Sequence, residues 1–189
     1  MFRAIELKSP VFSPKDFDFS IGCEKAFIEP DFSRVADKGA IRLSCVLEKA
    51  VFQDAEEKLG DAGEFFPLAG AASSGLFEKI KNFSFDNIFV TLEACGETVD
   101  IISFDARSGD IKILASGSVN EKGKLEFASR IFFSPAIASE LSGDARGFLK
   151  EESSGWMSYS ASFSGGENAS SLKFDSDRIK IEFNEMVIE

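Results

Sequence analysis

The feature of this sequence that most constrains its fold is a period of two in the apolar residues between Phe83 and Phe133. Successive side chains of a β-strand point to opposite faces, so alternation over this length predicts strands. The breaks in the pattern carry glycine and asparagine, which are typical of tight turns. We therefore expect a β-meander of four consecutive strands, at Phe83–Cys95, Thr98–Ala106, Gly109–Val119 and Leu125–Phe133.

One side of this meander is strongly apolar, and it needs apolar material opposite it because apolar surface is destabilising in water. That material is either the protein's own helices, which would close a core, or a bound apolar ligand, which would occupy an open groove. In the second strand, alternation predicts Val99 and Ile101 on one face and Ile102 and Phe104 on the other. The residues expected to form the apolar wall are Ile88, Val90, Leu92, Ile111, Ile113, Leu125, Phe127, Ile131 and Phe133.

Further strands and short helices are expected around the meander. Before it, the apolar pattern predicts strands at Asp16–Ile28 and Ala40–Phe52, joined by a connection with a helical turn at Asp31–Ala36. After it, strands are expected at Gly155–Ser164, Leu172–Phe174 and Arg178–Val187.

Residues 53–81 break the alternation and are expected to form a helical insert. One short helix would end at Gly60, and a second would be capped by Ser73 or Ser74. Pro135 predicts another helix, because proline suits the first turn. The expected fold is one mainly β domain spanning residues 1–189. It consists of an antiparallel, curled sheet of consecutive hairpins with two or three short helices.

Histidine is absent from the chain, which removes the usual general base and the commonest metal ligand. A Ser-His-Asp or Cys-His site is therefore impossible within it. Cys23, Cys45 and Cys95 are far apart and form no C-x-x-C pair, so we expect no metal site and no cofactor. Each cysteine lies in an alternating run and is expected to be buried, although an oxidising compartment would allow one disulfide.

The net charge of −11, from 21 basic and 32 acidic residues, argues against a nucleic-acid partner and against docking on anionic lipid. Acidic pairs such as Glu56 and Glu57 are expected to be solvated, and no motif supports a hydrolase that uses carboxylates. The serines at 158, 160, 162 and 164 are expected to form the wet face of an antiparallel sheet.

No apolar run reaches the roughly 18 residues that a membrane helix needs. The N-terminus begins with strand-like alternation and lacks a basic region followed by an apolar core. The chain is therefore either cytoplasmic or a fragment of a longer protein whose targeting segment lies upstream. We favour the fragment, because of the following similarity.

The blocks Gly75–Phe77, Phe83–Val90, Gly109–Val119 and Gly123–Ala128 together resemble the C-terminal part of AsmA-like proteins. In that family a short helix leads into a strand and a hairpin. A strand with a G-x-[VI] step follows, matched here by Gly117-Ser118-Val119, and the next hairpin returns on a Gly-x-Leu step. The similarity covers roughly residues 53–189, and the family's N-terminal membrane helix is missing from this chain.

This resemblance implies a non-enzymatic, periplasmic protein of the bacterial envelope. Its curled sheet would hold the acyl chains of phospholipid or another lipid, as a contribution to lipid transport or outer-membrane assembly. It would reach a membrane only through a segment absent from this chain. The alternative is a structural or protein-interaction β-domain with a closed hydrophobic core, and its protein partners are not implied.

Overall fold

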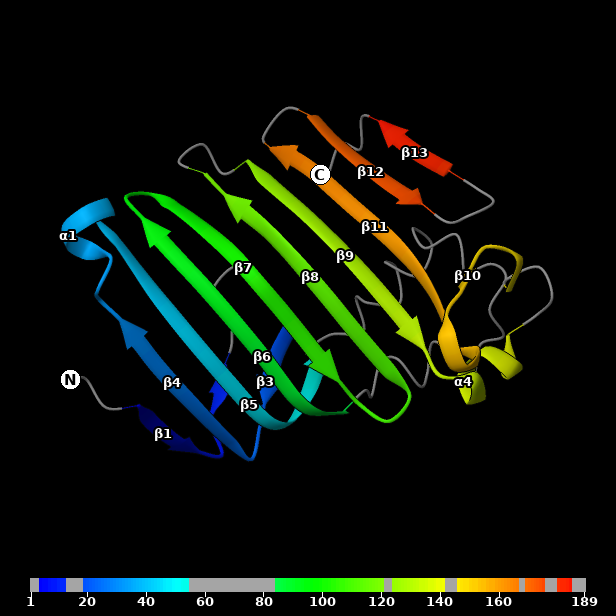
Figure 1. Ribbon diagram of the computed structural model, residues 1–189, viewed down its shortest axis with the longest axis horizontal. Helices are drawn as coiled ribbons and strands as arrows, with labels where there is room; N and C mark the ends of the chain where they lie inside the picture. The colour runs from blue at the N-terminus through cyan, green and yellow to red at the C-terminus, as the bar shows by residue number, and fades with distance from the viewer. Residues whose placement is uncertain are drawn as a thin grey trace.

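The structure is a computed structural model that describes residues 4–12, 19–54, 84–120, 124–141, 146–166, 169–175 and 180–184. Its main body is a 13-stranded antiparallel sheet, shown face-on in Figure 1. The strands run in the order β1-β4-β5-β6-β7-β8-β9-β11-β12-β13, while β2, β3 and β10 pair off this path. The expected fold, a mainly β antiparallel sheet with few helices, is therefore confirmed.

The elements follow the chain from one edge of the sheet to the other. The strands are β1 (Ile5–Lys8), β2 (Val11–Phe12), β3 (Phe19–Gly22), β4 (Lys25–Asp31), β5 (Ala40–Asp54), β6 (Ser84–Cys95), β7 (Thr98–Arg107), β8 (Ile111–Val119), β9 (Leu125–Phe133), β10 (Lys150–Glu151), β11 (Met157–Gly166), β12 (Ala169–Asp175) and β13 (Lys180–Asn184). The helices are α1 (Val35–Lys38), α4 (Pro135–Glu140) and the 3₁₀ turn η1 (Ser153–Gly155). The predicted meander corresponds to β6, β7, β8 and β9.

The prediction of a single strand at Asp16–Ile28 is wrong, because the described part of this segment forms two strands, β3 and β4. The reason lies in β5, which is 15 residues long and turns at Lys49, where φ is 52°. The first part of β5 pairs with β4, and its last residues pair with β3. One long strand therefore pairs with two shorter ones. The alternation of residues within one segment does not predict such a division, because the division depends on the partner strand.

The helices differ in part from those expected. The helical turn begins later than predicted, since Asp31 still pairs with Arg42 in the β4–β5 ladder. The helix α1 ends at Lys38, and Gly39 with a φ of 62° caps its C-terminus. The helix expected at Pro135 is present as α4. Its N-cap Ser134 accepts a hydrogen bond from the backbone N–H of Ile137 and donates one to Asp110. The expected helices near Gly60 and Ser73 lie outside the described residues.

The hydrophobic core lies on one face of the sheet, toward the end where α4 sits. At this end of the sheet the ring of Phe133 stacks on that of Tyr159, with ring centroids 6.0 Å apart. Burial raises the pKa of Tyr159. The buried apolar residues of this cluster include Cys23, Ala26, Leu47, Ala50, Phe85, Ile88, Ala106, Ile111, Phe133, Ile137, Leu141 and Leu149.

A polar cluster joins β9, β11 and the residue after β10 on the face of the sheet opposite this core. Ser158 is 1% exposed, so its prediction as a wet-face residue is wrong, whereas Ser162 and Ser164 are exposed as expected. The hydroxyl of Ser158 donates a hydrogen bond to Glu152 Oε1 at 2.7 Å and accepts one from Arg130 Nε at 3.3 Å. Arg130 also pairs with Glu152. A buried hydroxyl is tolerated here because both of its hydrogen-bonding functions are used.

We expect Ser158→Ala to lower the free energy of unfolding by about 1–2 kcal/mol at pH 7, because it removes these buried hydrogen bonds. The hydrogen bond from Ser158, followed by the charge of Arg130, holds the pKa of Glu152 below its ordinary value of 4.5. A lowered folded-state pKa contributes stability above the ordinary value and loses it as the pH falls. The free energy of unfolding of the variant should therefore approach that of the original protein below about pH 4.5.

Urea unfolding at pH 7 and at pH 3.5 measures this difference. The control is Ser162→Ala, since Ser162 is an exposed residue of the same strand. Equal effects of the two substitutions at pH 7, or a difference that widens in acid, would contradict the role assigned to the cluster.

Candidate functional site

The residues expected to form an apolar wall lie on the same side of the sheet. In an antiparallel ladder, directly paired residues share a face. Ile88 pairs with Ala106, Ala106 with Ile113, and Ile113 with Ile131. The other candidates follow the same register: Val90 pairs with Phe104, Leu92 with Ile101, Ile111 with Phe133, and Gly117 with Phe127. We call this side the apolar face. Leu125 pairs with Val119 in the backbone ladder.

A bulge in β7 corrects one prediction about this face. Phe104 was expected on the face of the sheet that Ile101 does not share. Both residues lie on the apolar face, because the register shifts between them. An extra residue in one strand changes the phase of alternation beyond it. Ile102, inside the bulge, is 45% exposed and lines the opposite face.

The apolar face is buried unevenly along the strands. Ile88 is 1% exposed and Ala106 is fully buried, and Ile111 and Phe133 are buried beside them. Toward the β6–β7 turn, exposure rises through the half-buried Leu92. It reaches 38% at Ile41, 39% at Val99 and 37% at Val119. We call the buried end the packed half and the other end, from Val90 and Phe104 to Ile41 and Val119, the open half.

The glycine at 117 brings β8 and β9 close together in the open half. A Cβ at Gly117 would lie 2.4 Å from the carbonyl oxygen of Glu126 and 3.1 Å from Cδ2 of Phe127. The ring of the half-buried Phe127 therefore covers the space that a side chain on β8 would take. A cross-strand pair of glycine and an aromatic residue is a known means of protecting glycine in a sheet.

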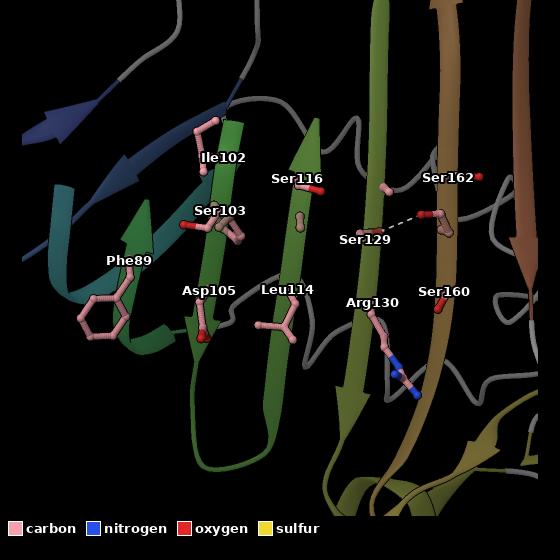
Figure 2. A pocket seen from close by; sticks show the side chains of 14 residues that line it. Phe89, Ile102, Ser103, Asp105, Leu114, Ser116, Ser129, Arg130, Ser160 and Ser162 are labelled. Carbon is pink, nitrogen blue, oxygen red and sulfur yellow. Dashed lines mark hydrogen bonds between the residues drawn. The ribbon is translucent and has the colours of Figure 1, made fainter. Parts of the chain in front are cut away.

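The opposite face, which we call the polar face, is hollowed where β7, β8, β9 and β11 run side by side (Figure 2). The hollow has a volume of about 720 Å³. Its middle is lined by small residues, among them Ser116, Ala128 and Ser162, while the exposed Phe89 and Ile102 lie at one side. This hollow was not predicted from the sequence. The exposed position of Phe89 follows from its place between Ile88 and Val90, but nothing in the sequence signals the bulge at Ile102.

Charges on the polar face are mostly paired with one another. Glu93 accepts hydrogen bonds from Arg42 at 3.0 and 2.7 Å and lies 3.4 Å from Arg34. At the other end of β7, Arg107 binds Asp105 at 2.8 and 2.5 Å. The hydrogen bonds from Arg107 hold the pKa of Asp105 below its ordinary value. Of these pairs, Arg42 with Glu93 joins two adjacent strands, while Arg107 and Asp105 lie on the same strand, β7. Pairing of this kind leaves little charge on this face for a ligand.

The three cysteines are free thiols, and Cys23 matches the expectation that they are buried. Cys23 is buried and Cys45 half-buried, and burial raises the pKa of both thiols. Cys95 differs, because it is exposed at the end of β6 and contacts the carbonyl oxygen of Lys38 at 3.3 Å. Across the described ranges, no three of the His, Cys, Asp or Glu side chains come together as metal ligands would. Within these same ranges, no helix has the length and apolar character to cross a bilayer.

Comparisons of the chain with protein-family models, with curated proteins and with solved structures found no match.

Proposed function

We propose that this protein is a non-enzymatic module of the bacterial envelope that binds or shields the acyl chains of lipids on the open half of its apolar face. The observation that carries the proposal is the rise in exposure along β5, β7 and β8, from buried residues such as Ala106 to the exposed Ile41, Val99 and Val119. A contiguous apolar surface left accessible on a folded domain is typical of a binding site for apolar matter.

The dimensions of the open half suit an acyl chain. From Ile41 to Cys45, which pairs with Val90, four residues at about 3.3 Å each span about 13 Å along β5. One leaflet of a bilayer's hydrocarbon core is about 15 Å thick, so the open half would cover most of the length of an acyl chain lying along the strands. Across the strands, the distance from β5 to β8 is about 14 Å at 4.8 Å per strand, which leaves room for more than one chain.

The envelope location and the link to lipid transport or outer-membrane assembly come from the AsmA-like similarity, and they are part of the proposal. No residue is assigned a catalytic role. The site would work by apolar contact, and it would need neither a metal nor a cofactor.

The packed half favours a second candidate, a structural or protein-interaction domain. Ile88, Ile111 and Phe133 belong to a buried cluster that includes residues of α4 and the segment after it. If the apolar face served only to form a closed core, the protein would bind no lipid. The two candidates therefore differ in a result that can be measured directly.

Mass spectrometry of an organic extract of the purified protein tests the proposal. We expect phospholipid in a stoichiometric amount that is released only on unfolding, with a lipid-free soluble protein purified in parallel as the control. An extract without lipid, from a protein that is folded and monodisperse, would contradict the proposal and favour the closed core.

A pair of neighbouring substitutions on β9 then locates the site. Phe127→Asp places a charge on the apolar face, where it should reduce bound lipid at least tenfold, because an acyl chain cannot solvate a carboxylate. Ala128→Asp places the same charge on the polar face, where Ala128 is exposed, and should retain lipid. Circular dichroism and unfolding curves establish that both variants fold. Equal lipid content in two folded variants would contradict the assignment of the face.

A further inference from the structure

The strand β1 forms one edge of the sheet (Figure 1). In the part of the chain that the structure describes, β1 pairs with β4 alone, in the register from Ile5 with Ile28 to Lys8 with Lys25. A strand at an edge turns a row of backbone N–H and C=O groups outward, and these groups can pair with a strand of another chain. The side chains of β1 determine which strand can pair with it.

These side chains alternate between the two faces of the sheet. Leu7 pairs with Ala26, and Ala26 with Leu47, so Leu7 lies on the apolar face. Glu6 and Lys8 therefore lie on the polar face. Both are exposed, and neither has an ion-pair partner among the described residues. The edge thus carries one carboxylate and one ammonium group, two residues apart on the same face.

The position of Lys8 is electrostatically unfavourable within one copy of the chain. Lys8 lies directly opposite Lys25 in the β1–β4 ladder, and like charges in such a pair are destabilising. Lys25 has Glu48 on its other side, in the β4–β5 ladder. In the described structure no strand lies on the other side of Lys8. A carboxylate placed there would offset the repulsion between the two lysines.

Antiparallel pairing of β1 with β1 of a second copy supplies this carboxylate. In the register that places Leu7 opposite Leu7 of the second copy, Glu6 of each copy lies opposite Lys8 of the other. A shift of two residues would place Glu6 opposite Glu6 in one direction and Lys8 opposite Lys8 in the other, which is repulsive. A shift of one residue would bring the apolar face of one copy against the polar face of the other. The side chains of β1 therefore select a single register.

The backbone confines this pairing to β1. After the strand, the chain turns at Ser9, where φ is 49°, and Pro10 has no N–H to donate to a partner. At the other end of the strand, Ile5 is 53% exposed. In the selected register Ile5 lies diagonally across from Leu7 of the second copy, within reach of its side chain. The pairing therefore also covers the most exposed apolar residue of β1.

We propose that β1 pairs with β1 of a second copy of this chain, which forms a twofold-symmetric dimer with one continuous sheet. The twofold axis passes between the two Leu7 residues, perpendicular to the sheet, so the apolar faces of both copies lie on the same side. Each contact occurs twice, as in any interface of this symmetry. The dimer does not depend on lipid binding, because it uses the edge of the sheet and no residue of the open half.

Analytical ultracentrifugation of the whole chain over a range of concentrations tests the proposal. We expect the original protein to show a monomer–dimer equilibrium. Glu6→Lys should raise the dissociation constant at least tenfold, because by symmetry it places two lysines opposite each other at two positions. Lys8→Glu should have the same effect, since it places two glutamates opposite each other. The control is Glu97→Lys, which makes the same change of charge at the exposed turn between β6 and β7 and should leave the dimer unchanged.

Exchange of the two charges separates a specific register from a general effect of charge. The double variant Glu6→Lys with Lys8→Glu keeps the net charge and recreates both ion pairs in reverse, so it should dimerise as the original protein does. An equimolar mixture of the two single variants should also dimerise, because each copy then supplies the charge that the other lacks. Circular dichroism establishes that every variant folds.

The proposal would be overturned if the original protein formed no dimer at concentrations up to about 1 mM. Single variants that dimerise as the original protein does, or a folded double variant that stays monomeric, would overturn it as well. Assemblies larger than a dimer would also contradict it. They would show that β1 pairs with β13 at the other edge of the sheet, an arrangement that extends without closing.

Discussion

Ile88→Asp is expected to abolish folding. Ile88 is 1% exposed and lies between Leu47 of β5 and Ala106 of β7, both of which are buried. A carboxylate at this position would lose its hydration and find no ion-pair partner among these neighbours, which is strongly destabilising. The net stability of a domain is only about 5–15 kcal/mol, so one uncompensated buried charge can remove most of it. We expect no cooperative unfolding transition from this variant by circular dichroism.

A milder substitution keeps this prediction quantitative. Ile88→Ala should fold and should lose about 2–5 kcal/mol of stability, because it leaves a cavity in the packed half. The neighbouring Phe89→Ala is the control, since Phe89 is 43% exposed on the polar face and should cost under about 1 kcal/mol. If Ile88→Asp folded with an unchanged melting temperature, water would reach this position, and the division into packed and open halves would be wrong.

Gly117→Ala is expected to destabilise the protein by about 3 kcal/mol, a cost at the upper end for overpacking by one methyl group. The added Cβ would lie 2.4 Å from the carbonyl oxygen of Glu126 and 3.1 Å from Cα of Phe127. These are backbone atoms of β9, which pairs with β8 along its whole length. The clash is relieved only by separating the two strands, so the damage spreads along the ladder.

Gly109→Ala is the matched control, because a Cβ at Gly109 meets nothing within 4 Å. It should leave stability unchanged or raise it slightly, since alanine reduces the freedom of the unfolded chain. Urea unfolding of both variants gives the comparison. Equal effects of the two substitutions would show that β9 yields to the added methyl group, contrary to the geometry at Gly117.

Much of the sheet could be read from local pattern. The bounds of β6, β7, β8 and β9 agree with the predicted strands to within two residues, because each strand has a long, regular alternation. The same alternation placed Ile88, Ile113 and Ile131 on one face, since a strand has only two faces. Local chemistry also predicted α4, where Pro135 and the capping Ser134 mark the start of the helix.

Departures from the prediction arise where two distant segments adjust to each other. The bulge between Ile101 and Phe104 reversed the predicted side of Phe104, and it exists only in relation to the pairing of β7 with β8. The turn at Lys49 divided one predicted strand into β3 and β4, because each pairs with a different part of β5. Ser158 follows the alternation of its strand, yet it is buried because Glu152 and Arg130 come together over it.

The sequence by itself determined the kind of structure, which is a meander of antiparallel strands with one apolar side. The period of two in the apolar residues and the composition are local properties, so they do not depend on how the strands are arranged. Only the tertiary structure decided how that apolar side divides, with Ile88 and Phe133 buried and Val99 and Val119 exposed. Exposure depends on what packs against a residue from elsewhere in the chain, and alternation along one strand carries no information about that neighbour.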